Sequence, residues 1–302
     1  MKEIKKKVQF IISIFLLISG QVYAQSMESL KQQINKMLIL KKAEVGVAIQ
    51  GTELSDTLSI NGEERFPMQS VFKFPIALAT LTEVDKGTLS LDQKIEISKS
   101  ELLPGLWSPI RDKYPEGATL TLAEIIQYTV SLSDNVGCDV LLRLLGGPQV
   151  VEQYFSQLGF NNIKIKINEE VMQNNWDLQF QNWTTPKEAN RILAYFYANA
   201  EETLSQDSYD FIWGIMRSTQ TGEKRLRGQL PKETTVAHKT GWSGVHKETG
   251  ISAAVNDIGI IFLPNGKFFI VSVFVTNSSE TTEENEKIIA EIAKLAWNYF
   301  MT

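Results

Sequence analysis

Cysteine and histidine are scarce in this chain. Its 302 residues include one cysteine, Cys138, and two histidines, His238 and His246. Protein zinc sites are built mainly from clustered cysteine and histidine side chains, so we expect no metal site of that kind. Because one cysteine cannot form an intrachain disulfide, the hydrophobic core must stabilise the fold, and a chain of this size can bury enough surface to do so.

An excess of basic residues is also missing. Lysine and arginine total 30 and aspartate and glutamate total 35, which gives a net charge of −5 and a pI near 5.3. Nucleic-acid-binding proteins need a basic face, so we expect no nucleic-acid partner. One local basic site would still be enough to bind a small anionic molecule.

After its first 24 residues the chain has no apolar stretch long enough to span a membrane. Residues 2–7 carry four lysines and one glutamate, residues 10–18 are almost wholly apolar, and Val22-Tyr23-Ala24 precedes Gln25. This order is typical of a signal peptide, which we assign to residues 1–24. Cleavage would leave 302 − 24 = 278 residues with a net charge of −5 − 3 = −8. We expect an exported, periplasmic monomer without a stable membrane anchor.

Strand patterns lie at both ends of the mature chain, and helical patterns fill the middle. Strands are expected at residues 45–49, 57–60, 234–239, 249–263 and 267–276, with a hairpin turn at Pro264-Asn265-Gly266. Helices are expected at residues 26–40, 70–84, 122–131, 135–145, 148–158, 186–198 and 283–300.

This order of elements predicts a discontinuous α/β domain with an all-α insertion. Residues 25–66 and 218–302 would form one antiparallel sheet flanked by helices, and residues 67–217 would form the inserted helical domain. Within the insertion, residues 164–184 are polar and loop-like. Long ordered loops are often functional, so this segment is a candidate for part of a site.

The motif Ser70-Val71-Phe72-Lys73 pairs a hydroxyl with an amine. Residues three apart on a helix share a face, and a serine in the first turn lies in the positive field of the helix N-terminus. Ser70 is therefore a candidate nucleophile, and Lys73 is a candidate proton acceptor. A chance S-x-x-K is common in a chain of this length, so the motif alone is weak evidence.

The motif Ser133-Asp134-Asn135 lies between two expected helices. The Ser133 hydroxyl could pass a proton to a leaving nitrogen, and the Asn135 amide could hold a substrate carbonyl. Serine, aspartate and asparagine are also the preferred N-cap residues, and helix capping is the favoured interpretation of this motif by itself.

The motif Lys239-Thr240-Gly241 ends an expected strand. An amine and a hydroxyl on an edge strand can bind a carboxylate, and a glycine lets a substrate approach the backbone closely. A simple strand end followed by a turn is the alternative interpretation.

Taken together and in this order, the three motifs resemble the signature S-x-x-K, S-D-N and K-T-G of the serine β-lactamase and penicillin-binding-protein superfamily. Their order and spacing are most similar to class A β-lactamases, over nearly the whole mature chain. The resemblance implies that fold and the hydrolysis of penicillins and cephalosporins through an acyl-enzyme, which confers antibiotic resistance. It also implies that Ser70, Lys73 and Ser133 are catalytic and that no metal or other cofactor is required.

The resemblance further implies a catalytic glutamate on the loop at residues 164–184. By its spacing to Thr184-Thr185-Pro186, Glu169 matches the family's position, and Glu170 is the competing candidate. Gln173 stands where the family usually has an asparagine that also holds the deacylating water.

Three further positions depart from the common class A pattern. Asn182 stands where many members have an aspartate, Ile167 replaces the arginine partner of that aspartate, and Asp139 replaces an asparagine. These changes resemble the extended-spectrum subgroup known as PER- and VEB-like. They predict a reshaped loop and cavity.

Asn135, Lys239, Thr240 and Gly241 would contact substrate in this family. The resemblance adds four more residues to these, namely Trp107, Arg225, Trp242 and Ser243. Trp107 matches an aromatic wall, with partly exposed packing as its alternative, and Arg225 matches a carboxylate-binding arginine, with a surface charge as its alternative. The main-chain N–H of Trp242 would join that of Ser70 in an oxyanion hole, and Ser243 would lie beside it.

Two other functions share the three motifs. A D,D-peptidase of the cell wall would be acylated by penicillin and would release it slowly. A β-lactam-binding sensor domain would stay acylated, and it usually has a membrane segment or a partner domain. Glu169 and the length of the chain favour the β-lactamase.

Overall fold

The computed structural model describes residues 26–53, 56–200 and 202–302. The expected signal peptide, residues 1–24, lies outside the described residues. Across those three described ranges, no helix is long and apolar enough to cross a membrane.

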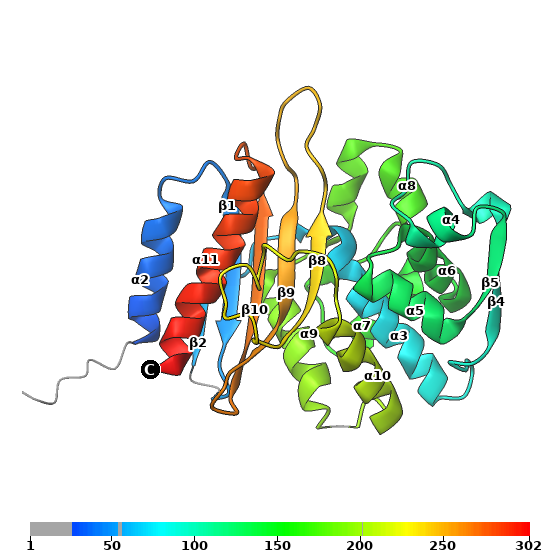
Figure 1. The fold of residues 1–302 in the computed structure, drawn as a ribbon, viewed down its shortest axis with the longest axis horizontal. Coiled ribbons are helices and arrows are strands. Elements are labelled where there is room, and N and C mark those ends of the chain that lie inside the picture. The colour runs from blue at the N-terminus through cyan, green and yellow to red at the C-terminus, as the bar shows by residue number, and fades with distance from the viewer. Residues whose placement is uncertain (1–25, 54–55, 201) are drawn as a thin grey trace, which may run out of the picture.

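One five-stranded sheet joins segments from both ends of the described chain (Figure 1). Its strand order is β2-β1-β10-β9-β8, and every neighbouring pair is antiparallel. The strands are β1 (Glu44–Gln50), β2 (Thr57–Ile60), β8 (Val236–Trp242), β9 (Val255–Phe262) and β10 (Phe268–Thr276). The predicted antiparallel sheet from both chain ends is confirmed.

Two strand boundaries differ from the expectation. Strand β8 continues to Trp242, so that Lys239 lies inside the strand, paired with Ile258. Strand β9 begins only at Val255, because the residues before it form a loop. The hairpin between β9 and β10 is confirmed, with Gly266 at a φ of 81° that a glycine adopts without strain.

Helices make up most of the segment between β2 and β8. Eight helices lie in the described part of this segment: α3 (Lys73–Asp85), α4 (Pro109–Lys113), α5 (Leu122–Ser131), α6 (Asn135–Leu145), α7 (Pro148–Gln157), α8 (Glu169–Gln173), α9 (Pro186–Ala198) and α10 (Gln206–Arg217). Two further described helices lie outside this segment, α2 (Met27–Leu38) before β1 and α11 (Thr282–Met301) after β10. Three short 3-10 segments are η1 (Gln69–Phe72), η2 (Lys99–Glu101) and η3 (Trp176–Gln181).

Some of these elements were not expected from the sequence. The start of the helix expected at residues 70–84 is wrong, because Ser70 lies in η1 and α3 begins at Lys73. Neither α10 nor the antiparallel pair of β4 (Lys94–Ser98) and β5 (Gly117–Thr121) was singled out. A small three-stranded sheet is also present, made of β3 (Phe66–Pro67), β7 (Trp183–Thr184) and β6 (Ile163–Lys164).

The sheet is buried on both faces, and strand β10 shows why. Its sequence is almost continuously apolar, as expected for a strand covered on both sides. Alternate side chains pack into two different clusters. Ile270 and Phe274 join the core shared with the helical segment and α9, whereas Val271 and Val273 pack toward α2 and α11. Helices α2 and α11 therefore cover one face and α9 covers the other (Figure 1).

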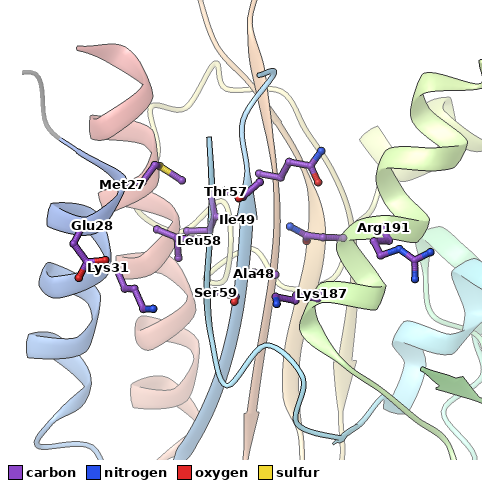
Figure 2. Close-up of a pocket in the computed structure, with 12 residues that line it drawn as sticks. Met27, Glu28, Lys31, Ala48, Ile49, Thr57, Leu58, Ser59, Lys187 and Arg191 are labelled. Atoms are coloured by element: carbon purple, nitrogen blue, oxygen red, sulfur yellow. The ribbon is translucent and has the colours of Figure 1, made fainter. Parts of the chain in front are cut away.

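The edge of the sheet far from the helical segment is protected against pairing. Strand β2 has four residues, and three of them line a groove of about 420 Å³ between α2 and α9. Lys31 from α2 and Lys187 and Arg191 from α9 flank the strand (Figure 2). Short edge strands with lysines nearby resist edge-to-edge association. The opposite edge, β8, borders the helical segment.

We expect Phe155 on α7 to be a major contributor to stability. It is fully buried, and its ring lies 6.0 Å from the rings of both Phe160 and Phe196. Phe155→Ala should lower the free energy of unfolding by about 3–5 kcal/mol because it leaves a cavity. Val150→Ala on the exposed side of the same helix should change it by less than about 0.5 kcal/mol. Equal effects in chemical denaturation would contradict this packing.

Candidate active site

Ser70 lies in a turn that both the helical segment and the sheet hold. Segment η1 leads directly into α3, and Lys73 Nζ lies 2.9 Å from Ser70 Oγ. The Asn256 side chain, on β9, donates to the carbonyl oxygens of Pro67 at 2.8 Å and Met68 at 3.1 Å. The sheet therefore fixes the turn that presents the Ser70 hydroxyl.

The residue before Ser70 has a strained backbone. Gln69 has a φ of 47°, in the left-handed region that non-glycine residues rarely adopt. Its side chain donates to Gln179 Oε1 at 2.6 Å, which ties the turn to η3. Gly241 has a packing role here, because a Cβ atom at this position would lie 2.4 Å from the Met68 carbonyl oxygen. The glycine therefore lets β8 approach the turn.

The amine of Lys73 brings the first two motifs and the loop together. Its side chain is fully buried, and Nζ donates to Ser70 Oγ, to the Ser133 carbonyl at 2.8 Å and to Asn135 Oδ1. Nζ also forms an ion pair of 2.9 Å with Glu169 Oε1. A buried amine needs such partners, because an unpaired charge in the interior is very unfavourable.

Lys239 supplies a second buried amine on the other side of Ser133. Its Nζ donates to Ser133 Oγ at 3.0 Å and to the Thr240 carbonyl at 3.0 Å. Burial lowers the pKa of Lys239 well below its usual value, and the nearby charge of Lys73 lowers it further. Ser133 therefore contacts both lysines, Lys73 through its carbonyl oxygen and Lys239 through its hydroxyl, and its backbone has a left-handed φ of 60°.

The capping interpretation of Ser133-Asp134-Asn135 is correct for its middle residue. Asp134 is fully buried and caps α6 by accepting from Gly137 N at 2.8 Å. It also accepts from Ser108 Oγ at 3.0 Å and from Ile110 N at 2.7 Å, and its burial raises its pKa. Asp134 is therefore structural, and it holds Ser133 and Asn135 next to Lys73.

Most of the predicted site residues meet in one cleft of about 310 Å³ between β8 and the helical segment. Its lining includes nine of the predicted residues: Ser70, Trp107, Ser133, Asn135, Glu169, Arg225, Thr240, Gly241 and Trp242. Lys73 and Lys239 lie buried beneath it. Thr221, which was not predicted, also lines the cleft, and its hydroxyl lies 2.6 Å from that of Thr240.

Arg225 is not a surface charge, so that alternative is wrong. Only 6% of it is exposed. Its Nη1 donates to the carbonyl oxygens of Gly241 and Asn256, both at 3.0 Å, and Nε donates to Glu286 at 3.2 Å. Arg225 therefore holds the end of β8 while it lines the cleft.

A neutral amide closes the neck of the loop at residues 164–184. Asn182 is fully buried, and its Oδ1 accepts from the N–H groups of Lys166 at 2.8 Å and Ile167 at 3.1 Å. Its Nδ2 donates back to the Ile167 carbonyl at 2.9 Å. These hydrogen bonds replace the aspartate–arginine ion pair that the resemblance would place at this neck. The Asn182 carbonyl also accepts from Met68 N, which joins the neck to the turn before Ser70.

Asp139 holds the first turn of α8, which carries Glu169. Its two carboxylate oxygens accept from Glu169 N at 2.8 Å and Glu170 N at 2.9 Å. The two glutamates then diverge: Glu169 is 5% exposed and contacts Lys73, whereas Glu170 is exposed to solvent. Of the two candidates, only Glu169 lines the cleft.

A second cavity of about 260 Å³ lies between the loop and the end of β8. Glu169, Gln173 and Ser243 line it, together with Trp176, which was not predicted. The Ser243 hydroxyl accepts from two main-chain N–H groups of the loop before β9, so its main contacts are structural. Trp176 packs edge-on against His246, with ring centroids 4.9 Å apart. An aromatic residue in a polar loop was the sequence signal for Trp176.

No metal site is evident in the described ranges. They contain no group of three or more histidine, cysteine, aspartate or glutamate side chains that could hold a metal ion. The chemistry of the cleft is that of hydroxyls, two amines and one carboxylate, a set suited to nucleophilic catalysis with proton transfer.

We expect the Asp139 carboxylate to make stability depend on pH. Burial raises the pKa of Asp139 to about 7, and the negative charge of Glu169 acts in the same direction. The hydrogen bond from Glu169 N–H acts in the opposite direction. Because the folded state binds the proton more tightly than the unfolded state, ionisation of Asp139 destabilises the fold as pH rises from about 4 to about 7. The melting temperature of Asp139→Asn relative to wild type should therefore rise over this range and then level off.

Asp92→Asn is the matched control for this measurement. Asp92 is exposed, so its variant should follow the wild-type profile at every pH. A constant difference between Asp139→Asn and wild type across pH 4.5–8 would contradict the proposed ionisation.

Known proteins resemble this chain over almost its whole length. A model of the β-lactamase enzyme family matches residues 29–300. Beta-lactamase VEB-1 of Pseudomonas aeruginosa is 52% identical over 302 residues, which cover 100% of this chain and 99% of that protein. Extended-spectrum beta-lactamase PER-1 of the same organism is 41% identical over 290 residues, which cover 95% and 93%. The crystal structure of TLA-3 extended-spectrum beta-lactamase has a TM-score of 0.89 at 50% identity, covering 92% of this chain and 100% of that one. The chain therefore belongs to the class A β-lactamases, enzymes that hydrolyse the β-lactam ring.

Proposed function

We propose that Ser70 attacks the lactam carbonyl and that the reaction proceeds through an ester on its Oγ. The Oγ–carbonyl bond forms while the lactam C–N bond breaks, and Ser133 passes a proton to the leaving nitrogen. The Ser70 proton goes to Lys73 directly or to Glu169 through a water molecule, and the contacts of Lys73 with both side chains support either route. The base then returns this proton to Ser133, which replaces the one that Ser133 gave to the nitrogen.

In this proposal Glu169 completes the cycle by taking a proton from the water that attacks the ester. The ester bond then breaks, Ser70 recovers its proton, and the opened product leaves. The main-chain N–H groups of Ser70 and Trp242 stabilise the oxyanion in both steps, and one such donor typically contributes about 3 kcal/mol. Gln173, which lines the neighbouring cavity, helps to hold the water.

The substrate carboxylate binds at the basic end of the cleft. Lys239 and Thr240 adjoin Ser133 there, and the Arg225 guanidinium lies behind Thr240 and Gly241. Asn135 holds the amide of the acylamino side chain, which extends into the second cavity. This cavity, beside Gln173 and Ser243, supports activity on bulky extended-spectrum cephalosporins. We further propose that the enzyme acts as a periplasmic monomer.

The contact between Glu169 and Lys73 is the main observation that supports this function. It puts a nearly buried carboxylate 2.9 Å from the amine that contacts the nucleophile. A D,D-peptidase or a sensor domain would be acylated without needing such a carboxylate for release. The contact therefore favours a complete hydrolytic cycle over both alternatives.

We expect Glu169→Ala to trap the acyl-enzyme. Wild type should turn over a chromogenic cephalosporin repeatedly, and Glu169→Ala should slow deacylation by roughly 10²- to 10⁴-fold, the usual effect of losing a general base. Mass spectrometry should then find the adduct on the peptide that contains Ser70.

Glu170→Ala is the matched control, because Glu170 is the exposed neighbour on the same turn. It should turn over without accumulating an adduct. Trapping by Glu170→Ala alone would move the role of base to Glu170. A wild-type protein that stalls after one equivalent would favour the peptidase or sensor function instead.

A further inference from the structure

Two exposed tryptophans flank the cleft that contains Ser70. Trp107 is 62% exposed and Trp242 is 52% exposed, and both line the same cavity of about 310 Å³. Large aromatic side chains usually bury most of their surface, and exposed ones often mark a binding surface. Across the described residues, no other tryptophan is counted among the large exposed hydrophobic side chains.

Trp107 is held by the edge of its indole and by its main chain, and Trp242 by its main chain, while both side chains stay more than half exposed. Trp107 Nε1 donates to the Leu132 carbonyl at 3.0 Å, and the Trp107 carbonyl accepts from Asn135 N at 3.0 Å. Trp242 is the last residue of β8 and pairs with Val255. Where the structure is described, neither indole stacks on another aromatic ring or on a cation.

The chemistry of the substrate indicates which part of it reaches these rings. In the proposed orientation the carboxylate lies at Lys239 and Thr240, and the acylamino group points to the second cavity. In a cephalosporin, the C3 substituent is on the ring carbon next to the one that bears the carboxylate. In that orientation the substituent lies beside Thr240, in the part of the cleft that Trp242 also lines. Neither Trp107 nor Trp242 lines the second cavity, so the acylamino group does not occupy the space between them.

We propose that the Trp107 and Trp242 indoles clamp a flat aromatic or heteroaromatic substituent at C3 of the substrate, and that Trp242 thereby selects such cephalosporins. The inference rests on the proposed catalytic function. Tryptophan faces attract aromatic rings in offset or edge-on geometry, and the Trp107 ring, held by its bond to the Leu132 carbonyl, loses little freedom on binding. A methyl group at C3 has no face to stack and gains little from the clamp.

The test compares two cephalosporins that share one acylamino group. One carries a neutral heteroarylthiomethyl group at C3 and the other carries a methyl group. Trp242→Ala in the full chain should lower kcat/KM for the heteroaryl substrate about five- to tenfold more than for the methyl substrate, mainly through KM. Trp242→Phe should recover most of the loss. The main-chain N–H at this position remains in both variants.

Val245→Ala is the matched control, because Val245 is 45% exposed on the adjoining loop and lines neither cavity. Its two kcat/KM values should both stay within twofold of wild type. An equal loss on both substrates in Trp242→Ala would overturn the clamp, because it would show that the end of β8 was disturbed. A gain on the heteroaryl substrate would also overturn it and identify Trp242 as a steric barrier. Lack of turnover of either substrate by wild type would instead refute the proposed function.

Discussion

The burial of one amine is the constraint on which the site depends. Lys73 is fully buried at the start of α3, and its Nζ contacts Ser70, Ser133, Asn135 and Glu169. An unpartnered amine there would destabilise the fold by several kcal/mol, so these contacts together also stabilise the fold. Folding the helical segment around Lys73 therefore brings nucleophile, proton donor and carboxylate together.

The sheet supports this arrangement from the other side of the cleft. Asn256 on β9 bonds to the turn before Ser70, and Arg225 bonds to the carbonyl oxygens of Gly241 and Asn256. The missing side chain at Gly241 allows β8 to reach that turn. These contacts fix β8 relative to the turn before Ser70, so that Lys239 on β8 stays in contact with Ser133. Such precision matters because a catalytic site needs its groups held to within fractions of an ångström.

The sequence predicted what depends on local spacing and on motif order. The pairing of Ser70 with Lys73 follows from their three-residue separation, and the position of Glu169 follows from its spacing to Thr184-Thr185-Pro186. The sequence did not reveal the burial of Arg225, because that burial depends on β9 and α11, which are distant in the chain. The bonds that Asn182 makes were likewise hidden, since they depend on how the loop closes on itself. The packing of Trp176 on His246, 70 positions further along the chain (246 − 176), was hidden for the same reason, although an aromatic residue in a polar loop was a signal at that position.

The role of Lys73 can be measured directly as the rate of acylation. In Lys73→Ala, mixed rapidly with excess cephalosporin and followed by mass spectrometry, we expect formation of the Ser70 adduct to slow by roughly 10²- to 10⁴-fold, because the nucleophile loses its neighbouring amine. Acylation within about threefold of the wild-type rate, in a variant that remains folded by circular dichroism, would contradict the view that this buried amine organises the site.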